Sequence, residues 1–278
     1  MPQTIRKEAG TFTFRWFASL VVLGSLSGRS PSSFVPALEM VSQHAPKDDA
    51  IDLFTGFSPR LLSMLAEIGL LLALRDNSVS DQSQVLHHGT QYSSEETLGY
   101  CLQLVRDIDT AMANSFLVPG VSYQGNNTAA PAKLASDFES LNKAYHNAAL
   151  LHLYRRIMGV SSSAYVVQKT AQDILSQVAS LSLLHEPCPA IAQLFPLFTA
   201  GCEVGSVTDR EQVMELLHSM QKFYNLLNVK QAIDFLRAFW AYRDQHETSV
   251  GDIVWDQYFG KHIFAWCKSH NLRRDSTA

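Results

Sequence analysis

Apolar residues recur along this chain at the spacing of an α-helix, and this pattern restricts the fold most. Two clear stripes run through Leu61, Leu65, Ile68 and Leu72, and through Leu134, Phe138, Leu141, Tyr145, Ala148 and His152. Residues three and four apart share one helix face, so each stripe can pack against a neighbour. The short run AYVV at 164–167 is the only strand candidate. The sequence predicts an all-α protein, a bundle or solenoid-like domain of about eight to ten helices.

Capping residues mark the expected ends of two of these helices. Ser58 before Pro59 predicts a helix start, because serine can accept from free backbone N–H groups and proline suits the first position. Gly159 predicts the end of the helix over 133–158, since glycine readily adopts the left-handed conformation that ends helices.

Two further helices are expected near the C-terminus. The sequence TDRE, Thr208 to Glu211, fits a capping box in which both side chains satisfy backbone donors. Asn228 is expected to separate the helix that follows from another over 228–245. So short a connection predicts that the two helices are antiparallel neighbours.

Composition indicates one folded domain. Of 278 residues, 46% are apolar and 17% charged, which is typical of a globular chain with a sizeable core. We expect one domain over residues 12–272, between an N-terminal tail at 1–11 and a C-terminal tail at 273–278, with polar loops at 78–94 and 119–131. A DNA-binding domain is usually basic on one face, and the net charge of −4 does not indicate such a domain.

An apolar segment near the N-terminus, RWFASLVVLGSLSG at 15–28, has two interpretations. Basic residues before it and small residues near its end resemble a signal peptide, which would make this a secreted helical protein. The segment is too short to span a bilayer, and a long aromatic region containing Glu8 precedes it. We therefore expect a core helix and no membrane association, with secretion as the alternative.

The stretch LFPLFTAGCEV, 194–204, combines a proline, small residues and a cysteine. Pro196 is expected to kink a helix or begin a second segment, because it removes a backbone donor. Gly201 and Cys202 are small enough for another helix to approach closely. Cys202 is expected to be buried and structural, since no cationic neighbour in sequence favours its thiolate. Glu203 then requires a partner or solvent.

Motifs for catalysis or metal binding are weak. The four cysteines are dispersed, which predicts reduced thiols, and the ten histidines form no metal-binding spacing. DDAID, Asp48 to Asp52, matches the D-D-x-x-D pattern of class I terpene synthases, in which carboxylates bind Mg²⁺. That family's partner motif is absent, so a Mg²⁺-dependent all-α enzyme remains only an alternative. We expect no metal and no cofactor.

Four blocks of the chain, in order, resemble the fungal-specific transcription factor domain, the helical regulatory region that usually follows a binuclear zinc cluster. The blocks are RWFASLVVLGSLSGRSPSSF, IDLFTGFSPRLLSMLAEIGLL, AYHNAALLHLYRRI, and LFPLFTAGCEV followed by DREQV and FWAYRD. The positions that carry the likeness include Gly56, Ser58, Tyr145, Arg155, Gly201, Cys202, Glu203 and Trp240. The likeness extends over about residues 12–260 and is consistent with a first core helix at 15–28.

The resemblance implies a nuclear transcriptional regulator rather than an enzyme. Its expected partners are a second copy of the chain or other transcription regulators, and a small-molecule effector. The family's DNA-binding part uses six clustered cysteines that hold zinc, whereas this chain has four scattered ones. Either an upstream zinc cluster is missing from the gene model, or the chain reaches DNA only indirectly.

The expected helix over 228–245 is apolar on two sides. Val229, Ile233, Leu236 and Trp240 form one stripe, and Phe235, Phe239 and Tyr242 form another. Such a helix is buried between layers, lines a cavity or meets a partner. Central burial, a self-association face and an effector pocket edged by the aromatic residues are therefore the alternatives.

Overall fold

The computed structural model describes residues 3–27, 32–80, 94–118, 130–183, 188–246 and 252–258. Within these ranges the chain is helical, and its one β-type contact is an isolated bridge between Ala50 and Phe116. The α-helices are α1 (Gln3–Leu26), α2 (Val35–His44), α3 (Pro59–Ser80), α4 (Ser94–Asn114), α5 (Ala130–His152), α6 (Tyr165–Ala179), α7 (Leu194–Glu203), α8 (Val207–Tyr224) and α9 (Leu227–His246). Short 3-10 turns at Ser32–Phe34 and Pro189–Gln193 precede α2 and α7, and a π-helical turn, Leu153–Ile157, extends α5. The all-α prediction is confirmed.

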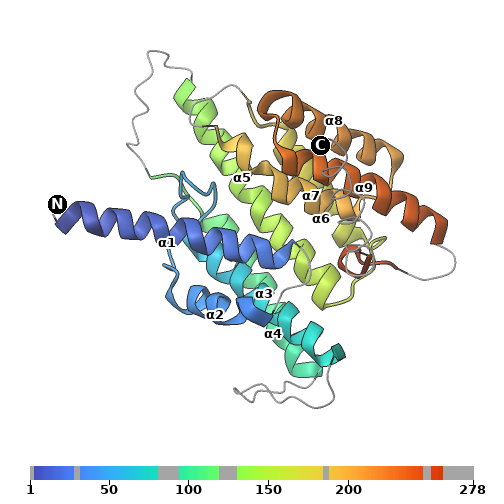
Figure 1. The fold of residues 1–278 in the computed structure, drawn as a ribbon, viewed down its shortest axis with the longest axis horizontal. Helices are drawn as coiled ribbons and strands as arrows, with labels where there is room; N and C mark the ends of the chain where they lie inside the picture. The colour runs from blue at the N-terminus through green and yellow to red at the C-terminus, as the bar shows by residue number, and fades with distance from the viewer. Residues whose placement is uncertain are drawn as a thin grey trace, which may run out of the picture.

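Helix α5 lies between two groups of helices, α1 to α4 on one side and α6 to α9 on the other (Figure 1). Its residues Leu141 and Tyr145 pack into the core formed with α1 to α4. Ala144 and Ala148 pack into the other core, with α6 to α9 and the segment 252–258. Because α5 is apolar on both faces, it joins the two cores.

The apolar N-terminal segment is part of α1 and borders the first core. Ala18, Val22 and Leu26 are fully buried against α2 and α3, whereas Trp16 and Leu20 are about half exposed. The helix begins at Gln3, so it includes most of the expected N-terminal tail. Among the helices within the described ranges, none combines the length and apolarity that crossing a membrane requires.

The predicted start of α3 and the predicted C-terminal end of the α5 helix agree with the structure. Helix α3 begins at Pro59, and the Ser58 hydroxyl oxygen accepts from the Leu61 N–H at 3.3 Å. The α5 helix continues through its π-helical turn, in which the Met158 N–H donates to the Leu153 carbonyl at 2.9 Å. Gly159 follows with a φ of +65°, the left-handed conformation that was expected there.

Two predicted boundaries near α8 were wrong. Ser206, not Thr208, caps α8, and its hydroxyl accepts from the Asp209 N–H at 3.0 Å. The sequence has a capping residue at both positions, and the earlier one begins the helix. Helix α8 ends at Asn225, where φ is +48°, so Asn228 lies within the first turn of α9.

The antiparallel arrangement of α8 and α9 is confirmed. Arg210 in the first turn of α8 forms a bidentate ion pair with Asp244 near the end of α9, with both N···O distances at 2.7 Å. The strand candidate AYVV instead begins α6, whose longer helical stripe from Val167 to Val178 decides the conformation. The expected loops 78–94 and 119–131 fall mostly outside the described residues; α3 extends to Ser80 and α5 begins at Ala130.

The stretch LFPLFTAGCEV forms α7, packed between α5, α6 and α9. Pro196 lies in its first turn, after the 3-10 turn, so it begins a second helical segment as one of the two predicted outcomes. Gly201 is a close-approach point. A Cβ atom there would lie 2.9 Å from Leu236 Cδ1 and 3.1 Å from Val213 Cγ1.

Gly201→Leu should therefore overpack this contact and lower the free energy of unfolding by about 1–3 kcal/mol. Gly99→Leu is the matched control, because a Cβ at Gly99, on an exposed face of α4, meets nothing within 4 Å. The control should keep or slightly raise stability, since leucine favours helices over glycine. Urea unfolding measures both. Equal midpoints for the two variants would show that α7 and α9 are not packed this closely.

Candidate functional site

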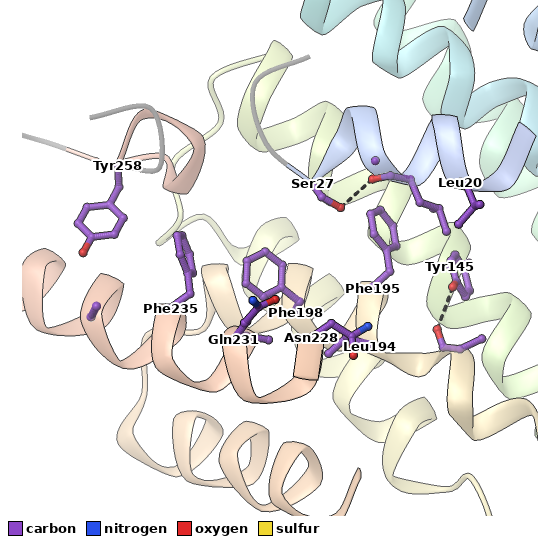
Figure 2. A pocket seen from close by; sticks show the side chains of 15 residues that line it. Leu20, Ser27, Tyr145, Leu194, Phe195, Phe198, Asn228, Gln231, Phe235 and Tyr258 are labelled. Atoms are coloured by element: carbon purple, nitrogen blue, oxygen red, sulfur yellow. Dashed lines mark hydrogen bonds between the residues drawn. The ribbon is translucent and has the colours of Figure 1, made fainter. Parts of the chain in front are cut away.

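A cavity of about 590 Å³ lies between the C-terminal end of α1, α7 and α9 (Figure 2). Tyr145 from α5 and Tyr258 from the C-terminal segment 252–258 complete its walls. The lining residues are Leu20, Leu23, Gly24, Ser27, Tyr145, Ala192, Leu194, Phe195, Phe198, Asn228, Gln231, Ala232, Phe235, Ala238 and Tyr258. This set includes no acidic, basic or histidine side chain.

Aromatic rings form much of the cavity wall. The Phe198 and Phe235 ring centroids are 5.4 Å apart, and the Tyr145 and Phe195 rings stack at 5.7 Å. Tyr258 packs edge-on against Phe235 at 5.7 Å. Rings at these distances attract one another and hold a defined wall.

Two hydroxyl groups in the lining already donate within the protein. The Tyr145 hydroxyl donates to the Ala192 carbonyl at 2.8 Å, and the Ser27 hydroxyl donates to the Leu23 carbonyl at 2.7 Å (Figure 2). Burial raises the pKa of Tyr145, so its phenol stays protonated and keeps this bond. These hydrogen bonds position Tyr145 and the end of α1 and supply no free acid or base for catalysis.

The two apolar stripes of α9 have different surroundings. Val229, Ile233, Leu236 and Trp240 are buried in the second core, as central burial predicts. In the other stripe Phe235 lines the cavity, Phe239 is fully buried, and Tyr242 packs against Tyr258 with ring centroids 5.0 Å apart. Burial between layers and a cavity edge thus both occur on α9.

Next to this cavity, the π-helical turn at the end of α5 places two consecutive arginines in the interior. The Arg155 Nε donates to Glu203 of α7 at 2.5 Å. Its two terminal nitrogens donate to both carboxylate oxygens of Asp252, at 2.8 and 2.9 Å. Both arginines lie at the C-terminal end of the α5 helix, where buried carboxylates neutralise them.

Arg156 connects three parts of the chain. It donates to Asp256 at 2.9 Å and to the Leu26 carbonyl at the end of α1 at 2.8 Å. Its guanidinium carbon lies 4.8 Å from the centroid of the Trp255 ring. Arg75 of α3 also donates to Asp256, at 2.7 Å, so this carboxylate faces two guanidiniums.

Burial and neighbouring charges shift the pKa values of Asp256, Glu203 and His152 in different directions. Burial by itself raises the pKa of the Asp256 carboxyl, but Arg156 and Arg75 outweigh it and hold that pKa below its usual value. Burial raises the pKa of Glu203, and the Arg155 guanidinium opposes that shift. Burial and then Arg156 lower the pKa of His152, which stays neutral and accepts from Arg156 through Nδ1 at 3.1 Å.

These ion pairs determine where the segment 252–258 lies. Asp252 and Asp256 fix it to the π-helical turn, and Trp255 between them is buried against Phe198 at 5.6 Å and Phe235 at 6.5 Å. Tyr258 then reaches the cavity wall. The buried charges therefore position an aromatic wall of the cavity.

The structure brings four of the predicted motif residues together in pairs. Arg155 contacts Glu203, which supplies the partner that Glu203 required. The Trp240 indole Nε1 donates to the Gly201 carbonyl at 2.9 Å. Cys202 is buried, and burial followed by the charge of Glu203 holds its pKa well above the usual range, as a structural thiol requires.

The other predicted positions act in the first core. Gly56 has a φ of +83°, and a Cβ there would lie 2.3 Å from a methyl carbon of Leu141. Ser58 caps α3, as described above. Of the eight predicted residues, Tyr145 lines the cavity. One of the three alternatives for the helix over 228–245 placed Phe235 at a pocket edge, where it lies. Leu20, Phe198 and Tyr258 were not predicted, because no local pattern indicates them.

The DDAID segment forms a turn before α3. The Asp48 carboxylate accepts from the Ala50 N–H at 3.0 Å, and Asp49 pairs with Arg60 at 3.2 Å. Asp52 pairs with Arg15 of α1 and accepts from the Phe54 N–H at 2.7 Å. Nowhere in the part of the chain that the structure describes do three or more His, Cys, Asp or Glu side chains gather as metal ligands would.

Asp256→Asn should leave the buried Arg156 without its counter-charge and lower the free energy of unfolding at pH 7 by about 3 kcal/mol or more. Asp244→Asn is the control, because Asp244 is 50% exposed in its ion pair with Arg210. That substitution should cost less than about 1 kcal/mol.

The same pair of variants gives a pH test. The folded-state pKa of Asp256 is depressed, so its carboxylate adds to the free energy of unfolding at pH values above the unfolded-state pKa of about 3.9. This contribution is lost as the pH falls through the folded-state pKa. Urea unfolding at several pH values should show the Asp256→Asn deficit shrinking in acid. A deficit at pH 7 no larger than that of Asp244→Asn would contradict the assigned role of the pair.

The comparisons with known proteins give one match. The model of the family described as fungal specific transcription factor domain matches residues 2–269. Neither a curated protein nor a solved structure matches the chain. The matched region includes the cavity, both arginines of the π-helical turn and all eight motif positions named above. The chain therefore belongs to the fungal-specific transcription factor domain family.

Proposed function

We propose that this chain is the regulatory part of a nuclear transcription regulator, and that a small apolar molecule bound in the cavity between α1, α7 and α9 controls it. Membership of a transcription factor family supports the regulatory role and is the basis for assigning the nucleus. The domain acts as a sensor and not as an enzyme.

The observation that carries the proposal is the cavity itself. Its volume of about 590 Å³ is in the range of small-molecule sites, which are mostly apolar and lined by aromatic side chains. Leu20 and Asn228 are exposed at its border, which gives a ligand access from solvent. An apolar ligand would replace water in the cavity and stabilise the fold in proportion to its affinity.

The neutral dye Nile red provides the first test. Wild-type protein should bind it with enhanced fluorescence, and Gly24→Leu should bind it at least about tenfold more weakly. Gly24 lines the cavity at an exposed position, and a Cβ there meets nothing within 4 Å, so a leucine can narrow the opening of the site without overpacking the helix. Gly99→Leu on α4 is the matched control and should bind like wild type. Unchanged dye affinity in Gly24→Leu would refute the site.

For DNA we propose that another element, elsewhere in the protein or in a partner, reads the sequence. The net charge of −4 disfavours tight contact with phosphates. A mobility-shift titration of this chain should show weak binding that does not depend on DNA sequence and that disappears as salt rises. Nanomolar, sequence-dependent binding by the chain alone would overturn this part of the proposal.

A further inference from the structure

We propose that the cavity selects an uncharged, mostly apolar ligand with one hydrogen-bonding group, such as a hydroxyl or an amide, and that the Gln231 carboxamide binds this group. The inference rests on the proposed function, because it names the ligand class for the same cavity. It goes further by assigning charge selectivity and a specificity-determining residue.

The first step is that none of the described residues lining the cavity carries a charge; their side chains are aliphatic, aromatic, hydroxyl and carboxamide groups. The nearby guanidiniums of Arg155 and Arg156 are already paired with Glu203, Asp252 and Asp256. A carboxylate or ammonium group entering the cavity would lose hydration without gaining a counter-ion, which is strongly unfavourable. The cavity therefore favours neutral ligands.

The second step is an inventory of the polar groups that line the cavity. The hydroxyl hydrogens of Tyr145 and Ser27 are used in bonds to backbone carbonyls. The Asn228 oxygen accepts from the Val229 N–H at 3.0 Å, and this side chain is exposed at the border. Gln231 is half-buried, and its carboxamide makes no hydrogen bond with the residues that the structure describes. The Tyr258 hydroxyl also belongs to the lining, and Figure 2 shows it directed away from Phe235 and Phe198. Gln231 is thus the half-buried polar side chain near these rings that is available to a ligand.

The third step is the position and chemistry of Gln231. It lies one helical turn before Phe235 on α9, and Figure 2 shows it among the side chains that line the cavity, with Phe198 and Asn228. A carboxamide offers two donors and an acceptor without carrying charge. It can therefore pair with a hydroxyl or an amide, while the rings of Phe198 and Phe235 contact the apolar part of the same ligand.

A matched ten-carbon series tests the selectivity by displacement of Nile red at pH 7.5. We expect 1-decanol and decanamide to displace the dye at concentrations at least about tenfold lower than decanoate and decylammonium. Decane should bind more weakly than decanol, because it leaves Gln231 unpaired. Decanoate or decane equal to decanol on the wild-type protein would overturn the proposal, although the cavity would still be a binding site.

Two substitutions test the role of Gln231. Gln231→Leu should keep Nile red binding and lose roughly tenfold in affinity for decanol and decanamide, with decane unchanged or improved. Gln231→Glu keeps the side-chain shape and adds a negative charge, so it should favour decylammonium over decanoate. Gln172→Glu, on an exposed position of α6, is the matched control for a general charge effect and should keep the wild-type order.

The remaining outcomes separate this inference from the proposed function. Unchanged alcohol affinity in Gln231→Leu removes Gln231 as the specificity residue. Failure of Nile red and of every compound in the series to bind overturns the proposed function itself. Loss of dye binding together with dimer formation in sedimentation, as protein concentration rises, would mean that a second copy covers the cavity, and this would also overturn the small-ligand proposal.

Discussion

The rest of this fold depends on the burial of two consecutive arginines in the π-helical turn after α5. A buried guanidinium without counter-charge is very unfavourable, so the chain must bring carboxylates to Arg155 and Arg156 from distant positions. Glu203 comes from α7, and Asp252 and Asp256 come from the segment beyond α9. Arg156 also reaches the last carbonyl of α1. The contacts that neutralise Arg155 and Arg156 therefore fix the relative positions of α1, α5, α7 and the segment 252–258.

The cavity is a product of that constraint. Its lining comes from segments separated by more than two hundred residues, from Leu20 to Tyr258. The ion pairs hold Trp255 in the interior, and Trp255 packs edge-on against Phe198 and Phe235. Ion pairs of this kind contribute little net stability compared with apolar packing, but they allow few alternative arrangements. In this protein they determine the shape of an apolar site to which the described lining residues bring no charge.

The sequence predicts what local patterns control. The helical stripes predicted the all-α class, and Ser58–Pro59 predicted the start of α3. The small residues around Gly201 predicted the close approach of α9 to α7. The predicted capping residue of α8 was wrong, because Ser206 and Thr208 can both cap a helix. The choice between them depends on the path of the chain before the helix. The partner of Glu203 and the cavity wall at Tyr258 depend on contacts between residues far apart in sequence, which one sequence does not reveal. The second stripe of α9 indicated a cavity edge, but only Phe235 of its three aromatic residues lies there.

An apolar cavity of this size tends to collapse, because its lining atoms lose dispersion contacts. Helix α9 cannot slide toward α1 to close it, since directional polar contacts hold α9 on α7. The Trp240 indole donates to the Gly201 carbonyl at 2.9 Å, and Arg243 donates to the carbonyls of Cys202, at 3.2 Å, and Val204. On the opposite wall, Arg156 holds the end of α1 through the Leu26 carbonyl. Both walls are therefore fixed by hydrogen bonds to backbone carbonyls, which act at defined distances and directions, unlike apolar contacts. The small residues at Gly201 and Cys202 let α9 rest directly on the C-terminal end of α7, and so the space remains on the α1 side, where Phe195, Phe198 and Phe235 face it.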